Sequence, residues 1–101
     1  MASFDFEFEW DALKAQTNIA KHGVNFERAT QVFLDPLALT IPDDEHSVEE
    51  ARWITMGKDA LNLYVLVVHT FEQSGESGAR IRIISARSPT KLEVRDYEEQ
   101  Q

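Results

Sequence analysis

The sequence predicts an α+β fold in the order β-α-α-β-β-β-β-α, with a small, mainly antiparallel sheet and the helices together on one side of it. Apolar and acidic residues alternate at the start of the chain, which is typical of a half-buried strand. Two stretches with apolar residues at helical spacing follow. Four strand-like stretches with short connections then precede a helix-capping motif. With 101 residues, the chain is expected to form a single domain over residues 1–101.

The N-terminal third is predicted to hold one strand and two helices. The aromatic residues that alternate with acids in the strand are Phe4, Phe6, Phe8 and Trp10. Asp11 and Gly23 suit the two ends of a first helix, as N-cap and C-cap. Asn25 suits the N-cap of a second helix, which Asp35-Pro36 ends because a residue before proline avoids the helical conformation.

The rest of the chain is predicted to be mainly strand. The expected strands are 37–41, 52–58, 61–71 and 80–87. The third of them contains the longest apolar run, which favours a central strand covered on both faces. An acidic loop, 42–49, and a glycine-containing turn, 73–78, separate strands. Thr90 and Glu93 match a capping box, so a last helix follows to about Glu99.

Composition excludes several classes of protein. The chain contains no cysteine, which excludes disulfides, thiolate metal sites and cysteine nucleophiles. The longest apolar run, Leu63 to Val68, has six residues, whereas a membrane span needs about 20. The N-terminus shows no signal-peptide pattern. We therefore expect a cytoplasmic protein with no membrane partner.

Charge is distributed unevenly. The net charge of −8 argues against nucleic-acid binding, since phosphate contacts need cations. However, the segment from Arg80 to Arg95 holds five cations and one acid, Glu93. These charges could belong to solvated faces of a strand and a helix, or could form a basic site on an acidic body.

Each of the three histidines has a structural and a functional interpretation. His22, in the last turn of a helix, suits the helix dipole. His69, near the end of the central strand, suits a hydrogen-bonded position at the edge of the core. His46 lies in the acidic loop, where it is either a surface residue or a functional one. Residues 43–46 are too close in sequence to converge on one metal ion, so no metal site is expected.

The arginines indicate a functional site more clearly than the histidines do. Strict alternation places Arg80 and Arg82 on one face of the last strand, and Ser85 and Arg87 on the other face with the isoleucines. The charges could simply protect an edge strand from aggregation. Alternatively, Arg87 at the strand's end suits forked recognition of a phosphate or a carboxylate.

Cleavage of RNA without a metal needs a base for the 2′-hydroxyl, an acid for the 5′-oxygen and cations for the phosphate. The candidates for proton transfer are His46, Lys21, His22 and Tyr97. The candidates for charge stabilisation are Arg52, Arg80, Arg82 and Arg87. The residue types therefore permit this chemistry, although they do not require it.

Several sequence blocks, in order, resemble the BrnT family of type II toxins from about Phe8 to Glu98. They are Phe8-Glu-Trp-Asp11, Lys21-His-Gly-Val24, Phe26-Glu-Arg-Ala29, Val32-Phe-Leu-Asp-Pro36, His46-Ser47, Glu50-Ala-Arg52, Val67-Val-His-Thr70 and Ile81-Arg-Ile-Ile-Ser-Ala-Arg87. The resemblance implies a RelE-like fold and a metal-independent endoribonuclease that needs no cofactor and inhibits translation. It also implies a BrnA-type, DNA-binding antitoxin as partner, with RNA as substrate and operator DNA contacted only through the antitoxin.

By the same resemblance, catalysis is expected at one histidine and three arginines, with RNA binding at neighbouring residues. The catalytic set is His46, Arg52, Arg82 and Arg87, and the RNA-binding set is Lys21, His22, Arg80, Ser85 and Tyr97. His46 is expected to act as base or acid while the arginines hold phosphate. The alternative is a non-catalytic module of the same fold that docks the antitoxin and tunes repression. A third possibility is a small-molecule enzyme with an apolar pocket beside the His46 loop.

Overall fold

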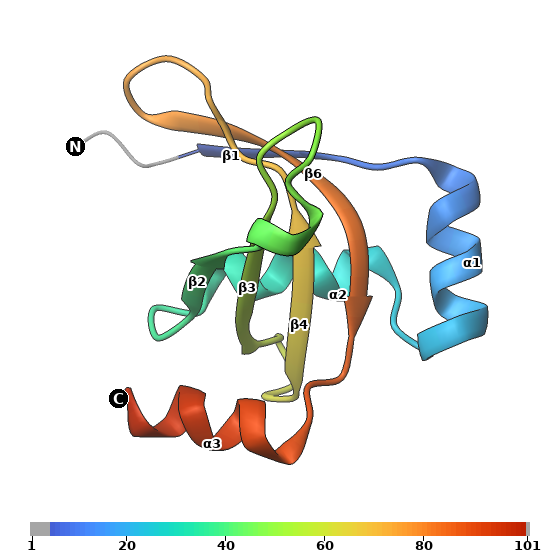
Figure 1. Cartoon of the computed structure of the whole chain (residues 1–101), viewed down its shortest axis with the longest axis vertical. Coiled ribbons are helices and arrows are strands. Elements are labelled where there is room, and N and C mark those ends of the chain that lie inside the picture. The colour runs from blue at the N-terminus through green and yellow to red at the C-terminus, as the bar shows by residue number, and fades with distance from the viewer. Residues whose placement is uncertain (1–4, 101) are drawn as a thin grey trace.

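A six-stranded sheet organises the chain in the strand order β1-β6-β4-β3-β2, with β5 paired to β6 (Figure 1). The structure is a computed structural model that describes residues 5–100, so the predicted strand residue Phe4 lies outside the described residues. The strands are β1 (Asp5–Glu9), β2 (Leu39–Pro42), β3 (Trp53–Lys58), β4 (Tyr64–His69), β5 (Glu72–Gln73) and β6 (Gly78–Arg87). Every pair is antiparallel except β1 with β6, which confirms an α+β fold with a mainly antiparallel sheet.

Three α-helices accompany the sheet among the described residues, and each begins after its predicted N-cap, whereas the second ends at Gln31 and a 3-10 turn fills the rest of the predicted helix before Asp35-Pro36. The helices are α1 (Ala12–His22), α2 (Phe26–Gln31) and α3 (Lys91–Glu99), with 3-10 turns η1 (Val32–Leu34) and η2 (Asp44–His46). Asp11 accepts a hydrogen bond from the Lys14 N–H at 3.0 Å, and Gly23 adopts the left-handed conformation that ends α1. The predicted capping box of Thr90 and Glu93 is formed. None of the helices within residues 5–100 has the length and hydrophobicity that crossing a bilayer requires.

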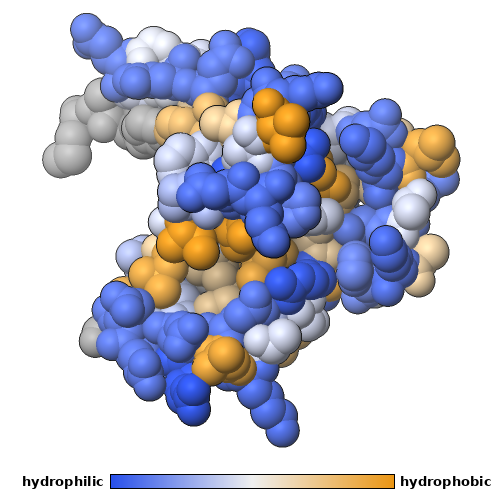
Figure 2. Space-filling view, viewed as in Figure 1, coloured by the Kyte–Doolittle hydropathy of each residue, from blue (hydrophilic) through white to orange (hydrophobic). Residues whose placement is uncertain are grey.

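The helices lie on both faces of the sheet, so the prediction of helices on one side was wrong. α2 packs behind the sheet in Figure 1, whereas α3 crosses the lower end of the front face. Tyr97 of α3 is buried there against Met56 and Leu66. Figure 2 shows apolar surface on the front face between the η2 loop and α3. The front face is therefore covered at one end only, because α3 is short.

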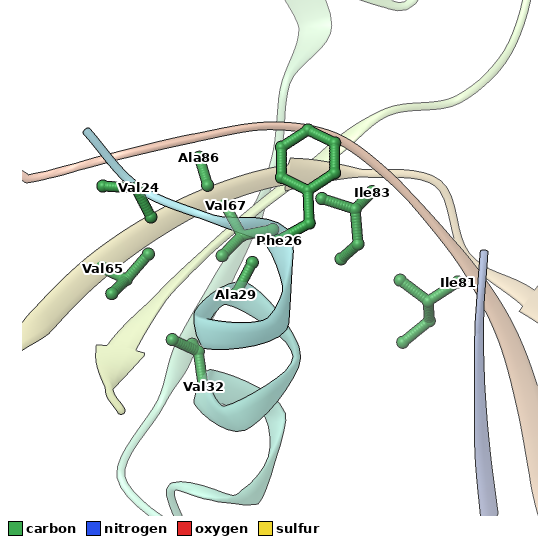
Figure 3. Close-up of a cluster of buried hydrophobic side chains, with 9 residues drawn as sticks. All are labelled: Val24, Phe26, Ala29, Val32, Val65, Val67, Ile81, Ile83 and Ala86. Carbon is green, nitrogen blue, oxygen red and sulfur yellow. The ribbon is translucent and has the colours of Figure 1, made fainter. Parts of the chain in front are cut away.

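The main core lies on the opposite face (Figure 3). It consists of residues from α2, β4 and β6 and their flanks, namely Val24, Phe26, Ala29, Val32, Val65, Val67, Ile81, Ile83 and Ala86. Each of the nine is at most 1 % exposed, as expected where alternate residues of two central strands meet an amphipathic helix. Asn18 of α1 secures the helix to this core through hydrogen bonds to the backbone of Val24 and Ala86.

A β-bulge changes which face the end of β6 presents. Ile83 pairs with His69 and Ser85 pairs with Val68, so the pairing skips one residue of β6. Val68 and His69 point to opposite faces, and directly paired residues share a face. Ser85 and Arg87 therefore lie on the front face with Arg82, and the prediction that they share a face with the isoleucines was wrong.

Candidate functional site

The loop between β2 and β3 is closed at its neck by backbone and hydroxyl hydrogen bonds. The Asp43 N–H donates to the Arg52 carbonyl at 2.9 Å. The Ser47 hydroxyl donates to the Asp43 carbonyl at 2.7 Å and accepts from the Arg52 N–H at 3.0 Å. These bonds hold His46, in η2 at the start of the loop, close to Arg52, where β3 begins.

His46 is oriented by a carboxylate. Its Nδ1 lies 3.0 Å from both carboxylate oxygens of Asp43, which is itself buried. The two residues are three apart, and in a 3-10 turn that spacing places side chains on the same side. A carboxylate at Nδ1 favours the proton there and leaves Nε2 for proton transfer. The imidazole is 64 % exposed, so Nε2 is accessible to a substrate.

Two arginines, Arg52 just before β3 and Arg82 in β6, meet at one carboxylate of the η2–β3 loop. The same Glu50 oxygen contacts Nη2 of Arg82 and lies 3.9 Å from Nη2 of Arg52. Thr70 fixes the backbone of Arg82, since its N–H donates to the Arg82 carbonyl and its hydroxyl accepts from the Arg82 N–H. An open pocket of about 320 Å³ adjoins this group, lined by Glu45, His46, Val48, Glu49, Glu50 and Arg52.

A chain of hydrogen bonds behind the pocket fixes the end of β4. The ring of His69, 1 % exposed, contacts the Thr55 hydroxyl at 2.7 Å and donates from Nδ1 to the Thr70 carbonyl at 2.8 Å. Since Nδ1 donates, Nε2 accepts from Thr55, which in turn accepts from Thr40. Burial lowers the pKa of His69, and the bond to Thr70 only partly offsets this effect. His69 is therefore a neutral, hydrogen-bonded core residue, as predicted.

Arg80 and Arg87 are paired with other carboxylates. Arg80 lies 3.8 Å from Glu7 on the neighbouring strand β1. Arg87 makes a two-pronged contact with Glu93 of α3, at 2.9 and 3.0 Å. The hydrogen bond from Arg87 lowers the pKa of Glu93 and, reciprocally, raises that of the guanidinium. At roughly 3.3 Å per residue, Arg87 lies about 16 Å along β6 from Arg82, outside the His46 pocket.

The other predicted site residues do not line this pocket. Ser85 is half-buried on the front face of β6, between the two arginines. Tyr97 is buried under α3, where burial and then its hydrogen bond to Asp35 raise its pKa to about 12. Lys21 and His22 are exposed in the last turn of α1, which lies at the right edge of Figure 1, away from the centrally placed η2 loop. The structure thus unites three of the nine predicted residues: His46, Arg52 and Arg82.

Two residues of this group were missed in the sequence. Asp43 could have been found from its spacing of three residues before His46. Glu50 could have been suspected because it precedes Arg52 by two residues, but nothing in the sequence indicates that Arg82 reaches it. Within residues 5–100, no three histidine, aspartate or glutamate side chains form a metal-ligand group.

Comparisons with known proteins agree on one family. The family model described as "Ribonuclease toxin, BrnT, of type II toxin-antitoxin system" matches residues 10–93. The crystal structure of the Brucella abortus ribonuclease toxin BrnT is similar, with 30% sequence identity and a TM-score of 0.59. That match covers 86% of this chain and 99% of the Brucella chain. No curated protein sequence matched significantly.

Proposed function

Because this chain belongs to the BrnT family of ribonuclease toxins of type II toxin–antitoxin systems, we propose that it cleaves RNA at the pocket of His46 and Arg52, beside Arg82. The observation that carries this proposal is a pocket shared by an exposed, carboxylate-oriented imidazole and Arg52, whose partner Glu50 also binds the guanidinium of Arg82 from β6. Metal-independent cleavage of a phosphodiester uses proton transfer and cations at the phosphate, and this group supplies one proton-transfer residue and two cations.

In the proposed reaction, the ribose 2′-oxygen attacks the adjacent phosphorus and the 5′-oxygen of the next nucleotide leaves. The 2′-hydroxyl loses its proton and the departing 5′-oxygen gains one; His46 carries out one of these two transfers through Nε2 and solvent water the other, while Asp43 holds the ring in place. Arg52 and Arg82 offset the negative charge that builds up on the phosphate. The products are a 2′,3′-cyclic phosphate and a free 5′-hydroxyl, and no cofactor takes part.

The arginines further along β6 suit contacts to neighbouring phosphates of the same strand. Arg80, Arg82 and Arg87 all point to the front face, with Ser85 between the last two. A spacing of about 16 Å between Arg82 and Arg87 is too long for one phosphodiester but fits phosphates a few nucleotides apart. We therefore assign Arg80, Ser85 and Arg87 to RNA binding along β6, and the scissile phosphate to Arg82.

The test is cleavage of a labelled RNA by the purified chain in the presence of EDTA, with the all-DNA version as substrate control. We expect His46→Ala to lower the rate by about 10²-fold or more, as for other general acid–base groups. Arg82→Ala should cost about as much, by loss of charge stabilisation. Arg95→Ala, an exposed arginine on α3, is the matched control and should leave the rate unchanged. Intact RNA with the wild-type chain would refute the proposal.

We also propose a BrnA-type antitoxin as partner, which would neutralise the toxin and connect it to operator DNA. The chain carries 18 acidic and 10 basic side chains, so a basic partner would be attracted to it. Growth arrest through inhibited translation, relieved by co-expression of the partner, is the expected phenotype.

The second candidate function is a non-catalytic docking module, favoured by the pairing of each β6 arginine with an internal carboxylate. The cleavage assay separates the two candidates.

A further inference from the structure

We propose that the Glu50 carboxylate occupies the position of the substrate phosphate in this structure, and that RNA must displace it to bind. The inference rests on the proposed function and concerns the regulation of the same site. A single oxygen, Oε1 of Glu50, serves both Arg82 and Arg52, with the Arg52 nitrogen at 3.9 Å. A guanidinium binds carboxylate and phosphate oxygens through the same forked donors, so the two anions compete for one place.

Arg52 is incompletely satisfied by this internal anion. Its contact with Glu50 is long, and among the described residues its Nε is buried with no hydrogen-bond partner. A buried donor without an acceptor costs free energy, and such a group in a folded protein calls for an explanation. A phosphate, with more acceptor oxygens than the one that Glu50 offers, would satisfy both arginines better.

Glu50 is also held less firmly than Glu93, the carboxylate that binds Arg87. Its contacts join half-exposed side chains, with exposures of 40% for Glu50 and 43% for Arg82, where ion pairs are weak. Glu93, in contrast, binds Arg87 with both oxygens while one of them also accepts from the Thr90 N–H of the helix cap. The loop of Glu50 can therefore release its side chain, whereas Glu93 is needed to hold α3 in place.

The experiment compares Glu50→Gln with Glu49→Gln, which removes the same charge from the same pocket. Glu49 lines the pocket and is exposed, and it pairs with no cation among residues 5–100. The probe is a fluorescein-labelled 2′-O-methyl oligonucleotide of 12 nucleotides, which lacks the attacking hydroxyl and stays intact. Its Kd is measured by fluorescence anisotropy, and thermal unfolding confirms that both variants fold.

We expect Glu50→Gln to tighten binding by about fivefold relative to wild type, and Glu49→Gln to stay within about twofold. With unmodified RNA, Glu50→Gln should lower KM while kcat stays within about threefold of the wild-type value. Equal effects of the two variants, or weaker binding by Glu50→Gln, would overturn the inference. So would a large loss of kcat, since Glu50 would then take part in the chemistry. If the wild type leaves RNA intact but Glu50→Gln still tightens binding, the ribonuclease proposal fails and the displacement of Glu50 stands.

Discussion

The Asn18 side chain pairs with the edge of β6 where no described strand adjoins it, and its removal should lower the stability of the fold. β1 covers the outer edge of β6 only from Gly78 to Arg82. Further along that edge, the Asn18 amide pairs with both backbone groups of Ala86, donating to its carbonyl at 2.8 Å and accepting from its N–H at 3.1 Å. It also donates to the Val24 carbonyl at 2.9 Å. One buried amide therefore connects α1, the α1–α2 connection and β6.

Asn18→Ala removes these three hydrogen bonds and leaves the backbone of Ala86 unpaired in a buried place. At about 1 kcal/mol for each bond, with an added penalty for unsatisfied groups, we expect a loss of about 3 kcal/mol in the free energy of unfolding. For a domain of this size, that loss lowers Tm by about 15 °C. The measurement is urea unfolding followed by tryptophan fluorescence. Thr17→Ala, an exposed neighbour on α1, is the control and should change stability by less than about 0.5 kcal/mol. A loss below about 1 kcal/mol for Asn18→Ala would show that water or a shift of α1 replaces these bonds, and would refute the reasoning.

Three further predictions concern stability. His69 is buried in its neutral form and its pKa is lowered. Its contribution to the free energy of unfolding is therefore fully present above its ordinary pKa of 6.5, and is lost as pH falls toward the folded-state pKa. Urea unfolding between pH 7.5 and 5 should show stability falling by up to about 1.4 kcal/mol per pH unit, and a flat profile would contradict this. Tyr97→Phe should lower the free energy of unfolding, measured by chemical denaturation, by about 1 to 2 kcal/mol because Asp35 loses a buried hydrogen-bond donor. Tyr64→Phe removes a hydroxyl that bonds an exposed carboxylate, and should lower it by less than half as much. Gly57→Ala should cost about 1 to 3 kcal/mol in the same assay, because a Cβ there would lie 2.9 Å from an oxygen of Asp35; unchanged stability would mean that β3 shifts freely.

Features set by local chemistry could be predicted from the sequence. The caps of α1 and α3 lie where Asp11, Gly23 and the pair Thr90 and Glu93 placed them. These motifs satisfy backbone groups within a few residues, so they depend little on the rest of the fold. The buried, hydrogen-bonded state of His69 was likewise predictable from alternation along one strand.

Features set by pairing between distant segments were not predictable in this way. The bulge in β6 depends on its register with β4, and one skipped residue moved Arg87 to the other face. The place of α3 depends on Tyr97 finding Asp35, which lies 62 residues away. Glu50 joined the candidate site through Arg82, 32 residues away, and no local spacing encodes that contact.

The parallel pairing of β1 with β6 has a consequence for synthesis of the protein. The first strand finds its partner only near the other end of the chain, since Asp5 pairs with Gly78 and Glu9 with Arg82. Contacts between such distant segments form late, because a long stretch of chain must first be brought together. A nascent chain therefore has neither a finished sheet nor the contact between Arg82 and Glu50 until β6 has emerged from the ribosome. A chain interrupted before Arg82 would carry His46 and Arg52 without the second guanidinium that Glu50 binds.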